Sequence, residues 1–398
     1  MLGLVLTAGG ARGAYQAGVL KRIGEMRSLR GKPSPFSIIA GASAGAINGA
    51  MVAATASNIA DGTHVLSKLW SDLTVERVFR TDALALGALG ARFIRDLSLG
   101  GLIGGGTVQS LLDTTPLRAF MAANLPMAGV GQAIGAGHLY ALAVSATSYH
   151  SGKSFTFIQG RKGHPVWIKS RRVALRVELT ADHICASAAI PIVFPPVQVG
   201  SELGECWFGD GGMRQVTPFS PAIRLGADRI FAVGIRCQSS ADALSRAELR
   251  ADEESHGGLA SIARPPLAQI CGVFLNAIFL DHLDTDLDHL KRMNDLIANS
   301  NGNGRGRKRG AAMQEPMRRI EPMVINPSAD LAIVAAAFAH KMPRAVRYVL
   351  DGLGTPDAQS ADLMSYLLFD SSYTRALIDI GYQDAAARLD EIESFLLG

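Results

Sequence analysis

The chain contains no charged residue between Pro33 and Ala60, a length that a membrane span could also have. The stretch consists mainly of alanine, glycine and serine, however, and it includes two asparagines and the sequence GASAG. We therefore interpret it as a buried strand at residues 36–40 that runs through a tight turn into a buried, alanine-rich helix. No transmembrane segment is expected.

A similar unit precedes this stretch. Residues 2–7 (LGLVLT) form an apolar run of strand length, the loop AGGARG follows, and a helical pattern begins near Gly13. Strand, glycine loop, helix, strand, turn and helix in this order open a parallel α/β sheet. Further strands are expected at 139–146, 153–158, 205–209 and 229–235, and helices at 180–189 and 218–226. The predicted fold class is α/β, a three-layer α/β/α sandwich with a mainly parallel central sheet and a C-terminal helical region.

Composition excludes several classes of protein. Of the 398 residues, 48% are hydrophobic and 19% charged, which excludes a disordered chain. The net charge of +4 is too small to indicate a nucleic-acid binder. The four cysteines form no CxxC pair, so neither a zinc site nor any other metal site is expected. Few cysteines and an N-terminus without signal-peptide features favour a cytoplasmic location.

The order of these segments suggests a catalytic core with additions. We expect a core at 1–238, an extension at 239–327 and a C-terminal helical region at 328–398. The extension is expected to contain a long helix, from 266 to 297, and a flexible basic loop at 300–310.

Two segments allow more than one interpretation. Residues 82–106 are rich in leucine and glycine, which suits either a lid or membrane-facing insertion or an ordinary pair of core helices. The run Arg305, Arg307, Lys308 and Arg309 could attract anionic lipid, although a solvated loop explains it more simply.

The strongest local signal is the sequence Gly41-Ala42-Ser43-Ala44-Gly45, a G-x-S-x-G motif between an apolar strand and a helix. This is the arrangement of a nucleophile elbow, in which small residues allow a very sharp turn. Ser43 is then presented at the N-terminus of the next helix, whose dipole favours developing negative charge.

The first glycine loop, Ala8 to Gly13, can serve the same chemistry. Its consecutive glycines allow backbone N–H groups to point together at an oxyanion. Arg12 could brace the loop or contact a phosphate. A Rossmann nucleotide loop is the competing interpretation, but Ala8 stands at its first glycine position and residues 36–45 offer no acid for a ribose.

A serine nucleophile needs a base. None of the nine histidines has a context typical of a catalytic triad. In Trp207-Phe208-Gly209-Asp210-Gly211-Gly212, by contrast, a carboxylate leaves an apolar strand and enters a tight turn. An ordinary Asp-Gly turn without a catalytic role would have the same sequence pattern.

Together these motifs resemble the patatin-like phospholipase family. The resemblance rests on the glycine loop, GASAG, ASAAIPIVFPP at 186–196 and the Asp-Gly-Gly turn, in that order, and it covers about residues 1–235. Ala8 departs from it, because the family usually has a third glycine there. The resemblance implies a Ser-Asp dyad, with Ser43 as nucleophile and Asp210 as base.

The resemblance also implies the surroundings of the dyad. The backbone amides of Gly9, Gly10 and Ala11 would form the oxyanion hole. Supporting roles would fall to Arg12, Gly13, Gly41, Gly45, Gly211 and Gly212. A carboxylate of ordinary pKa is a poor base for a hydroxyl, so we expect burial beside Trp207 and Phe208 to raise the pKa of Asp210.

The implied activity is that of a lipid acyl hydrolase without a cofactor, working on a lipid at a membrane or micelle surface, in the cytoplasm or peripherally on a membrane. An acyltransferase with the same dyad, a Rossmann-type nucleotide-binding protein and a catalytically idle membrane scaffold remain alternatives. Intact Ser43 and Asp210 argue against the scaffold. The head group, the chain length, the sn-position and the oligomeric state stay open.

Overall fold

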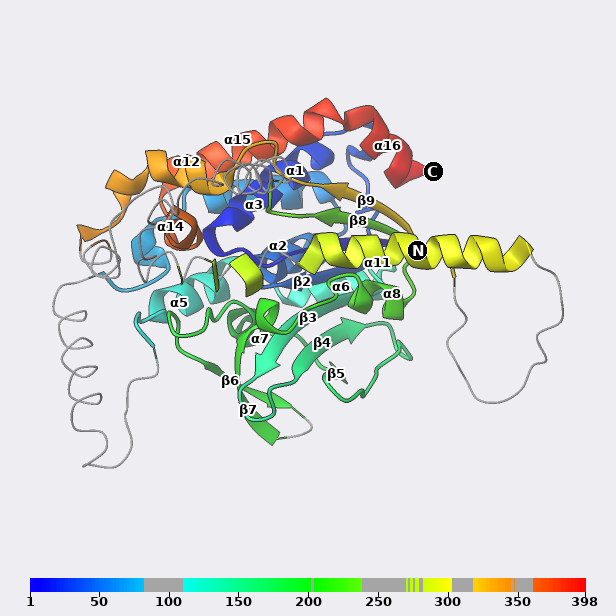
Figure 1. Cartoon of the computed structure of the whole chain (residues 1–398), viewed down its shortest axis with the longest axis horizontal. Coiled ribbons are helices and arrows are strands. Elements are labelled where there is room, and N and C mark those ends of the chain that lie inside the picture. Colours follow the sequence, from blue (N-terminus) through cyan, green and yellow to red (C-terminus); the bar gives the residue numbers. More distant parts are fainter. Residues whose placement is uncertain are drawn as a thin grey trace, which may run out of the picture.

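The computed structural model in Figure 1 describes residues 1–81, 110–201, 204–237, 282–302, 318–344 and 361–398, and isolated positions between 270 and 278 and at 347. The lid or insertion expected at 82–106 lies outside the described residues. Residues 303–310 of the expected basic loop also lie outside the described residues.

A nine-stranded sheet forms the centre of the fold. Its strands are β1 Leu2–Leu6, β2 Ile38–Ala42, β3 Ala141–Ser148, β4 Ser154–Gly160, β5 Arg172–Arg176, β6 Val197–Ser201, β7 Gly204–Asp210, β8 Arg229–Val233 and β9 Glu321–Ile325. The main path runs β5-β4-β3-β2-β1-β8-β9, and β7 pairs with both β3 and β6. Strands β3, β2, β1, β8 and β9 are mutually parallel. This confirms the predicted α/β class with a mainly parallel sheet.

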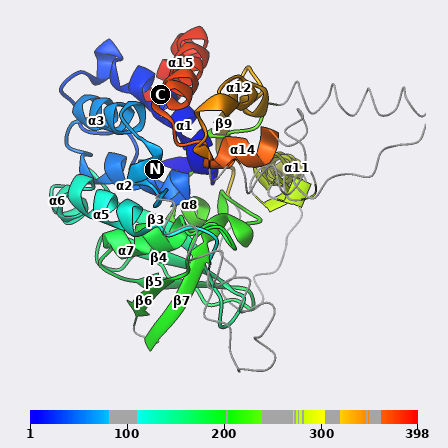
Figure 2. The same cartoon turned by 90° about the vertical axis from the view of Figure 1, so that its left-hand side faces the viewer.

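Helices cover both faces of the sheet. They are α1 Gly13–Gly24, α2 Ala44–Ala54, α3 Ile59–Ser71, α5 Thr115–Asn124, α6 Ala128–Gly135, α7 Ala181–Ser187, α8 Ser220–Leu225, α11 His282–Gly302, α12 Leu331–Ala337, α14 Ala361–Leu367, α15 Ser371–Ala387 and α16 Leu389–Leu397. Short 3₁₀ helices are η1 Gly10–Arg12, η2 Arg27–Leu29, η3 Val75–Arg77, η4 Gly211–Met213 and η5 Ala339–Lys341. Figures 1 and 2 show the sheet between these helical layers.

The alternation of side chains along β1 explains the three layers. Leu4 and Leu6 pack into a large core with α1, α2, α3 and α15, whereas Val5 points to the opposite face and packs with α8 and α11. A strand that is apolar on both faces is typical of a parallel sheet covered by helices on each side. The apolar run LGLVLT is therefore explained.

The last part of the chain belongs to the same body. Strand β9 pairs in parallel with β8, α15 packs along α1, and α14 contacts η1. Asp330 caps α12, and its carboxylate accepts a hydrogen bond from the Ala332 N–H group over 2.8 Å. The residues from 318 onward that the structure describes thus extend both the sheet and one of its helical layers.

Several elements differ from the sequence-based expectation. Strands β5, β6 and β9 were not predicted; β9 contains Pro322, which a strand at the edge of a sheet tolerates. Helix α11 begins at His282 and continues to Gly302, so residues 300–302 of the expected basic loop are helical. Within the described residues, no helix is both long and apolar enough to cross a membrane.

Candidate active site

Strand β3 brings the predicted nucleophile and the predicted base together. Its first part pairs with β2, and the pairing ends where Ser145 lies opposite Ala42, the residue before Ser43. Its last part pairs with β7, beginning where Ala146 lies opposite Asp210. Because β2 and β7 end at adjacent positions of the same strand, Ser43 and Asp210 become neighbours.

The backbone of Ser43 is strained. Its φ of 55° and ψ of −128° lie outside the regions that non-glycine residues usually adopt, and α2 begins at the next residue. The Ser43 N–H group donates to the Ser187 hydroxyl over 2.9 Å, and this hydroxyl donates to the Ser145 carbonyl over 2.6 Å. A side chain at Gly45 would collide with the Leu6 carbonyl, which explains the small residue there. The local geometry is that of a nucleophile elbow.

Asp210 is completely buried. Its Oδ1 accepts a hydrogen bond from the Gly212 N–H group over 2.8 Å, whereas Oδ2 is buried without a hydrogen-bond partner among the described residues. Burial raises the pKa of Asp210 to about 7, and the nearby Ser43 hydroxyl and the Gly212 N–H group oppose that rise. The carboxylate therefore faces the serine with one oxygen free to accept a proton near neutral pH.

The glycine-rich loop lies beside the elbow, because Leu6 of β1 pairs with Gly41 of β2. Gly10 has a φ of 54°, which only glycine adopts at little cost, and it lines the same pocket as Ser43. The N–H groups of Gly10 and Ala11 donate no hydrogen bond within the described part of the chain. Gly10 thus brings an N–H group without an acceptor among the described residues to the pocket of Ser43, and Ala11 follows it in the loop.

Arg12 does not face this pocket. Its side chain is buried and forms an ion pair with Asp362 of α14, with 2.8 Å between Nη2 and Oδ1. Its Nε donates to the Ser365 hydroxyl over 2.8 Å, and its guanidinium lies 4.3 Å from the centre of the Tyr366 ring. These contacts join the glycine-rich loop to α14, which is the arrangement that bracing of the loop would need.

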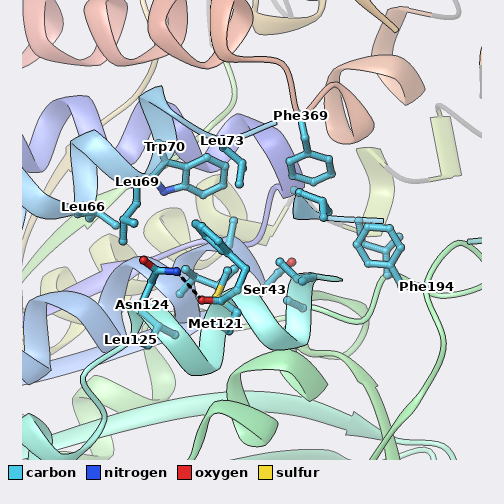
Figure 3. Close-up of a pocket in the computed structure, with 18 residues that line it drawn as sticks. Ser43, Leu66, Leu69, Trp70, Leu73, Met121, Asn124, Leu125, Phe194 and Phe369 are labelled. Atoms are coloured by element: carbon cyan, nitrogen blue, oxygen red, sulfur yellow. Dashed lines mark hydrogen bonds between the residues drawn. The ribbon is translucent and has the colours of Figure 1, made fainter. Parts of the chain in front are cut away.

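A narrow apolar pocket with a cavity volume of about 50 Å³ extends from Ser43 between α3 and α5 (Figure 3). Apart from Ser43 and Asn124, the described residues that line it are apolar or aromatic. The Asn124 amide donates to the Phe120 carbonyl. The lining residues are Gly10, Ser43, Ala44, Ile47, Leu66, Leu69, Trp70, Leu73, Val78, Leu117, Phe120, Met121, Asn124, Leu125, Ala188, Ile190, Phe194 and Phe369. Such a pocket suits an alkyl chain and offers few partners to a nucleotide.

Comparison with protein families agrees with this geometry. A sequence profile described as patatin-like phospholipase matches residues 4–223, which is more than half of the chain. The chain belongs to the patatin-like phospholipase family. This confirms the resemblance inferred from the motifs, and it supports the expectation of an esterase.

Comparisons with individual proteins add less. No curated protein sequence matches the chain. Among solved structures, VipD from Legionella pneumophila is similar over 95% of this chain and 66% of its own length, with 12% identity and a TM-score of 0.31. The type III effector protein ExoU is similar over 61% of this chain and 44% of its own length, with 16% identity and a TM-score of 0.24. The chain thus spans less than two thirds of either protein.

The remaining family-motif residues occupy supporting positions. The Gly13 carbonyl accepts a hydrogen bond from Asn48, and Gly41 lies within β2 beside the turn. A side chain at Gly211 would collide with the Ser145 carbonyl, and one at Gly9 would collide with Ile235. Gly212 donates the hydrogen bond to Asp210. Gly41, Gly211 and Gly212 adjoin the two turns, Gly13 lies beside Ala44, and Gly9 lies against Ile235.

Sequence reasoning missed several residues of the site. Ser187 holds the backbone of the nucleophile, although only its place in the segment 186–196 hinted at a role. Phe194 and Phe369 line the pocket (Figure 3). Trp70 is buried and also lines the pocket, and its indole N–H donates to Asn48 over 2.7 Å.

No histidine of the described residues hydrogen-bonds to Ser43 or Asp210. The buried His183 is held by the N-cap of α7 through Thr180, and burial lowers the pKa of His183 to about 4. Within the same described ranges, no cluster of three His, Cys, Asp or Glu residues is arranged to hold a metal ion.

Proposed function

We propose that this protein is a serine lipid acyl hydrolase that cleaves carboxylic esters through the dyad of Ser43 and Asp210. The observation that carries the proposal is the meeting of a strained serine and a buried carboxylate with one unpartnered oxygen at the end of an apolar pocket. The pocket would hold the acyl chain, and the ester carbonyl would then lie over Ser43.

In the first half of the reaction, the Ser43 hydroxyl attacks the ester carbonyl while Oδ2 of Asp210 accepts its proton. The negative charge that develops on the carbonyl oxygen is stabilised by the backbone N–H groups of Gly10 and Ala11, with Gly9 beside them. The tetrahedral intermediate collapses, the bond to the alcohol breaks, and the alcohol leaves with the proton from Asp210. The acyl group remains on Ser43 as an ester.

In the second half, a water molecule attacks the acyl-enzyme and gives a proton to Asp210. The fatty acid leaves when the second tetrahedral intermediate collapses, and Ser43 recovers its proton. One aspartate therefore serves both halves, because each needs a proton acceptor first and a proton donor afterwards. A pKa of about 7 suits both tasks near neutral pH.

A fluorophosphonate probe tests the proposal. We expect mass spectrometry to find the probe on Ser43 of the native chain, and no labelling of the Ser43→Ala variant. Hydrolysis of a short-chain soluble ester should be lost in the same variant. Labelling at another serine, or an active Ser43→Ala variant, would overturn the assignment.

A further inference from the structure

A group of exposed apolar side chains lies beside the mouth of the pocket. Tyr149, Ile192 and Trp207, here called the apolar rim, are 44%, 68% and 36% exposed. The Tyr149 N–H group donates to the Trp207 carbonyl over 3.0 Å, and all three residues line one surface hollow. Phe194 lines both this hollow and the pocket that contains Ser43. Phe194 thus separates the apolar rim from the candidate active site and belongs to the lining of both.

Ile192 is unusual in its backbone as well as its exposure. Its φ is 70°, a conformation that strains a β-branched residue. The backbone around it is fixed, because the Leu111 and Leu112 N–H groups donate to the carbonyls of Ile192 and Val193 over 2.8 and 2.9 Å. The strained backbone thus holds an aliphatic side chain in solvent. No burial within the described part of the chain offsets this strain, which points to a partner outside the chain.

Basic residues surround the apolar rim. The sequence from Tyr149 to Arg176 contains no aspartate or glutamate. Lys153, Arg171 and Arg214, here called the basic group, form no ion pair within the described part of the chain.

Backbone contacts place the basic group next to the apolar rim. Lys153 closes the turn that contains Tyr149, since its carbonyl accepts from the Ser148 N–H group over 3.0 Å. Arg171 follows across the sheet, because its carbonyl accepts from the Ser154 N–H group over 3.0 Å. A side chain at Gly152 would lie 3.7 Å from the Arg214 guanidinium.

Two acidic side chains lie on the same strand as Trp207, the buried Asp210 and Glu205. Glu205 of β7 is exposed, and its carboxylate accepts a hydrogen bond from the Gln198 amide over 2.7 Å. It lies further from Asp210 along β7 than Trp207 does, and Figure 2 shows β7 reaching out from the body of the fold. Among the described residues near the apolar rim, three side chains are basic and, besides the buried Asp210, two are acidic, Glu205 and Asp113, the residue after Leu112.

We propose that the apolar rim and the basic group form a docking surface for a bilayer that contains anionic lipid. Tryptophan and tyrosine favour the membrane interface, and basic side chains are attracted to anionic head groups. The choice of a lipid partner rests on the proposed function, because docking at this rim would bring the mouth of the acyl pocket to the surface where lipid esters lie. A protein that covers the rim is the competing outcome.

Vesicle binding tests the proposal with the full chain. Flotation would compare vesicles of phosphatidylcholine with vesicles made of equal parts of phosphatidylcholine and phosphatidylserine. The Ser43→Ala variant serves as the background, so that the vesicles stay intact. We expect binding to the mixed vesicles, weaker binding to phosphatidylcholine, and loss of binding as salt is added. Equal binding to both vesicles, or binding to neither, would overturn the proposal.

The apolar contribution is tested by Ile192→Asn. Asparagine tolerates positive φ, so the variant should melt no lower than its parent, yet vesicle binding should weaken about tenfold through the loss of apolar insertion. Leu296→Asn is the matched control, since Leu296 is 60% exposed on α11, whose C-terminal half extends to the right in Figure 1, away from β7. Unchanged binding by Ile192→Asn, or equal losses in both variants, would contradict the apolar rim.

The charged contribution is tested by Lys153→Ala and Arg171→Ala. Each should weaken binding to the mixed vesicles roughly fivefold, the effect of one basic residue near an anionic surface. The control is Lys162→Ala, because Lys162 follows the far end of β4, which pairs with the start of β3. Equal effects at all three positions would contradict the proposal.

Hydrolysis of a soluble ester separates this proposal from the proposed function. A chain that hydrolyses the soluble ester but ignores vesicles retains the proposed function and loses the docking surface. A chain that binds mixed vesicles as expected but hydrolyses no ester retains the docking surface and loses the proposed function.

Discussion

Arg12 and Asp362 form an ion pair that links the glycine-rich loop to helix α14, with 2.8 Å between Nη2 and Oδ1. The side chain of Arg12 is 3% exposed and that of Asp362 is 33% exposed, so the arginine is buried while the aspartate partly contacts solvent. A helix near the end of the chain therefore supports the loop that carries the proposed oxyanion hole.

The first prediction concerns this ion pair. Arg12→Lys keeps the charge but loses the planar fork that contacts both Asp362 and Ser365. We expect a loss of about 2 kcal/mol in the free energy of unfolding, below the 3–5 kcal/mol typical of broken buried pairs because Asp362 is partly exposed. We also expect kcat on a soluble ester to fall about tenfold with KM unchanged. Urea unfolding and steady-state kinetics measure both.

The matched control is Arg118→Lys. Arg118 contacts both carboxylate oxygens of Asp182, but this pair lies at the surface. Its replacement should change stability by less than about 1 kcal/mol and leave kcat unchanged. Similar losses in the two variants would show that Arg12 has no special role in holding the loop.

The second prediction concerns the dyad. Ser43→Ala and Asp210→Asn should each remove nearly all esterase activity, and the double variant should be scarcely worse, because residues that act as one unit are not additive. Asp182→Asn, an exposed change of the same kind, should retain activity. Activity retained in Asp210→Asn and lost on replacing a histidine would indicate a conventional triad instead.

The third prediction concerns pH and activity. Burial raises the pKa of Asp210 to about 7, and the base must be ionised to accept the proton from Ser43. We expect kcat/KM to fall tenfold for each unit of pH below about 7 and to level off above it. The pH profile on a soluble ester measures this. An acid limb near 4 would show that the carboxylate is not perturbed.

Stability should respond to pH in the opposite sense. The folded chain holds the proton on Asp210 up to a pKa of about 7, and the unfolded chain only up to 3.8, the ordinary value. The stability from this group is therefore complete below pH 3.8 and is lost as the pH rises through about 7. In the Asp210→Asn variant, the side chain at this position is uncharged at every pH. We expect the variant to melt higher than the native chain above pH 8, while remaining inactive.

The fourth prediction concerns Gly10. Its φ of 54° and the Tyr366 carbonyl beside it leave no room for a side chain, so Gly10→Ala should shift the loop and displace its N–H groups. Loss of one such donor costs about 2.7–4 kcal/mol of transition-state stabilisation, or roughly 10²–10³ in kcat. The melting temperature should fall as well. Ala8→Gly is the control and should do little, since no positive φ occurs at Ala8.

The fifth prediction concerns the length of the acyl chain. Leu66 lines the pocket on the α3 side, away from Ser43 (Figure 3). Leu66→Trp should fill that end, and each methylene excluded should cost about 0.8 kcal/mol, roughly fourfold in kcat/KM. Long-chain esters should suffer while short-chain esters do not. Val65→Trp, on the exposed side of the same helix, is the control; an equal loss for all chain lengths would contradict this role for the pocket.

The parts of the site that were predictable from sequence are those fixed by neighbours in the chain. The turn at Ser43 needs small residues on either side, and the turn after Asp210 needs Gly212 to donate its N–H group, so both leave local signatures. Strand β2, which carries the first turn, is buried on both faces, whereas β7, which carries the second, is buried only over its last three residues.

The parts that were missed depend on distant contacts. Arg12 and Asp362 are 350 residues apart, and Ser43 and Ser187 are 144 residues apart. Neither partner has a local pattern that points to the other. Strand β9 was missed for a related reason, since Pro322 argues against a strand unless its place at the edge of the sheet is known.

The parallel pairing of β1 with β8 has a consequence for biosynthesis. The Thr7 hydroxyl contacts the Val233 carbonyl, 226 residues later, and α1 is covered by α15. Strand β1 and helix α1 are synthesised more than 200 residues before β8 and α15, so they must wait for these partners. Because contacts so distant in sequence slow folding, we expect a nascent chain to stay without esterase activity until β8 and α15 have been made.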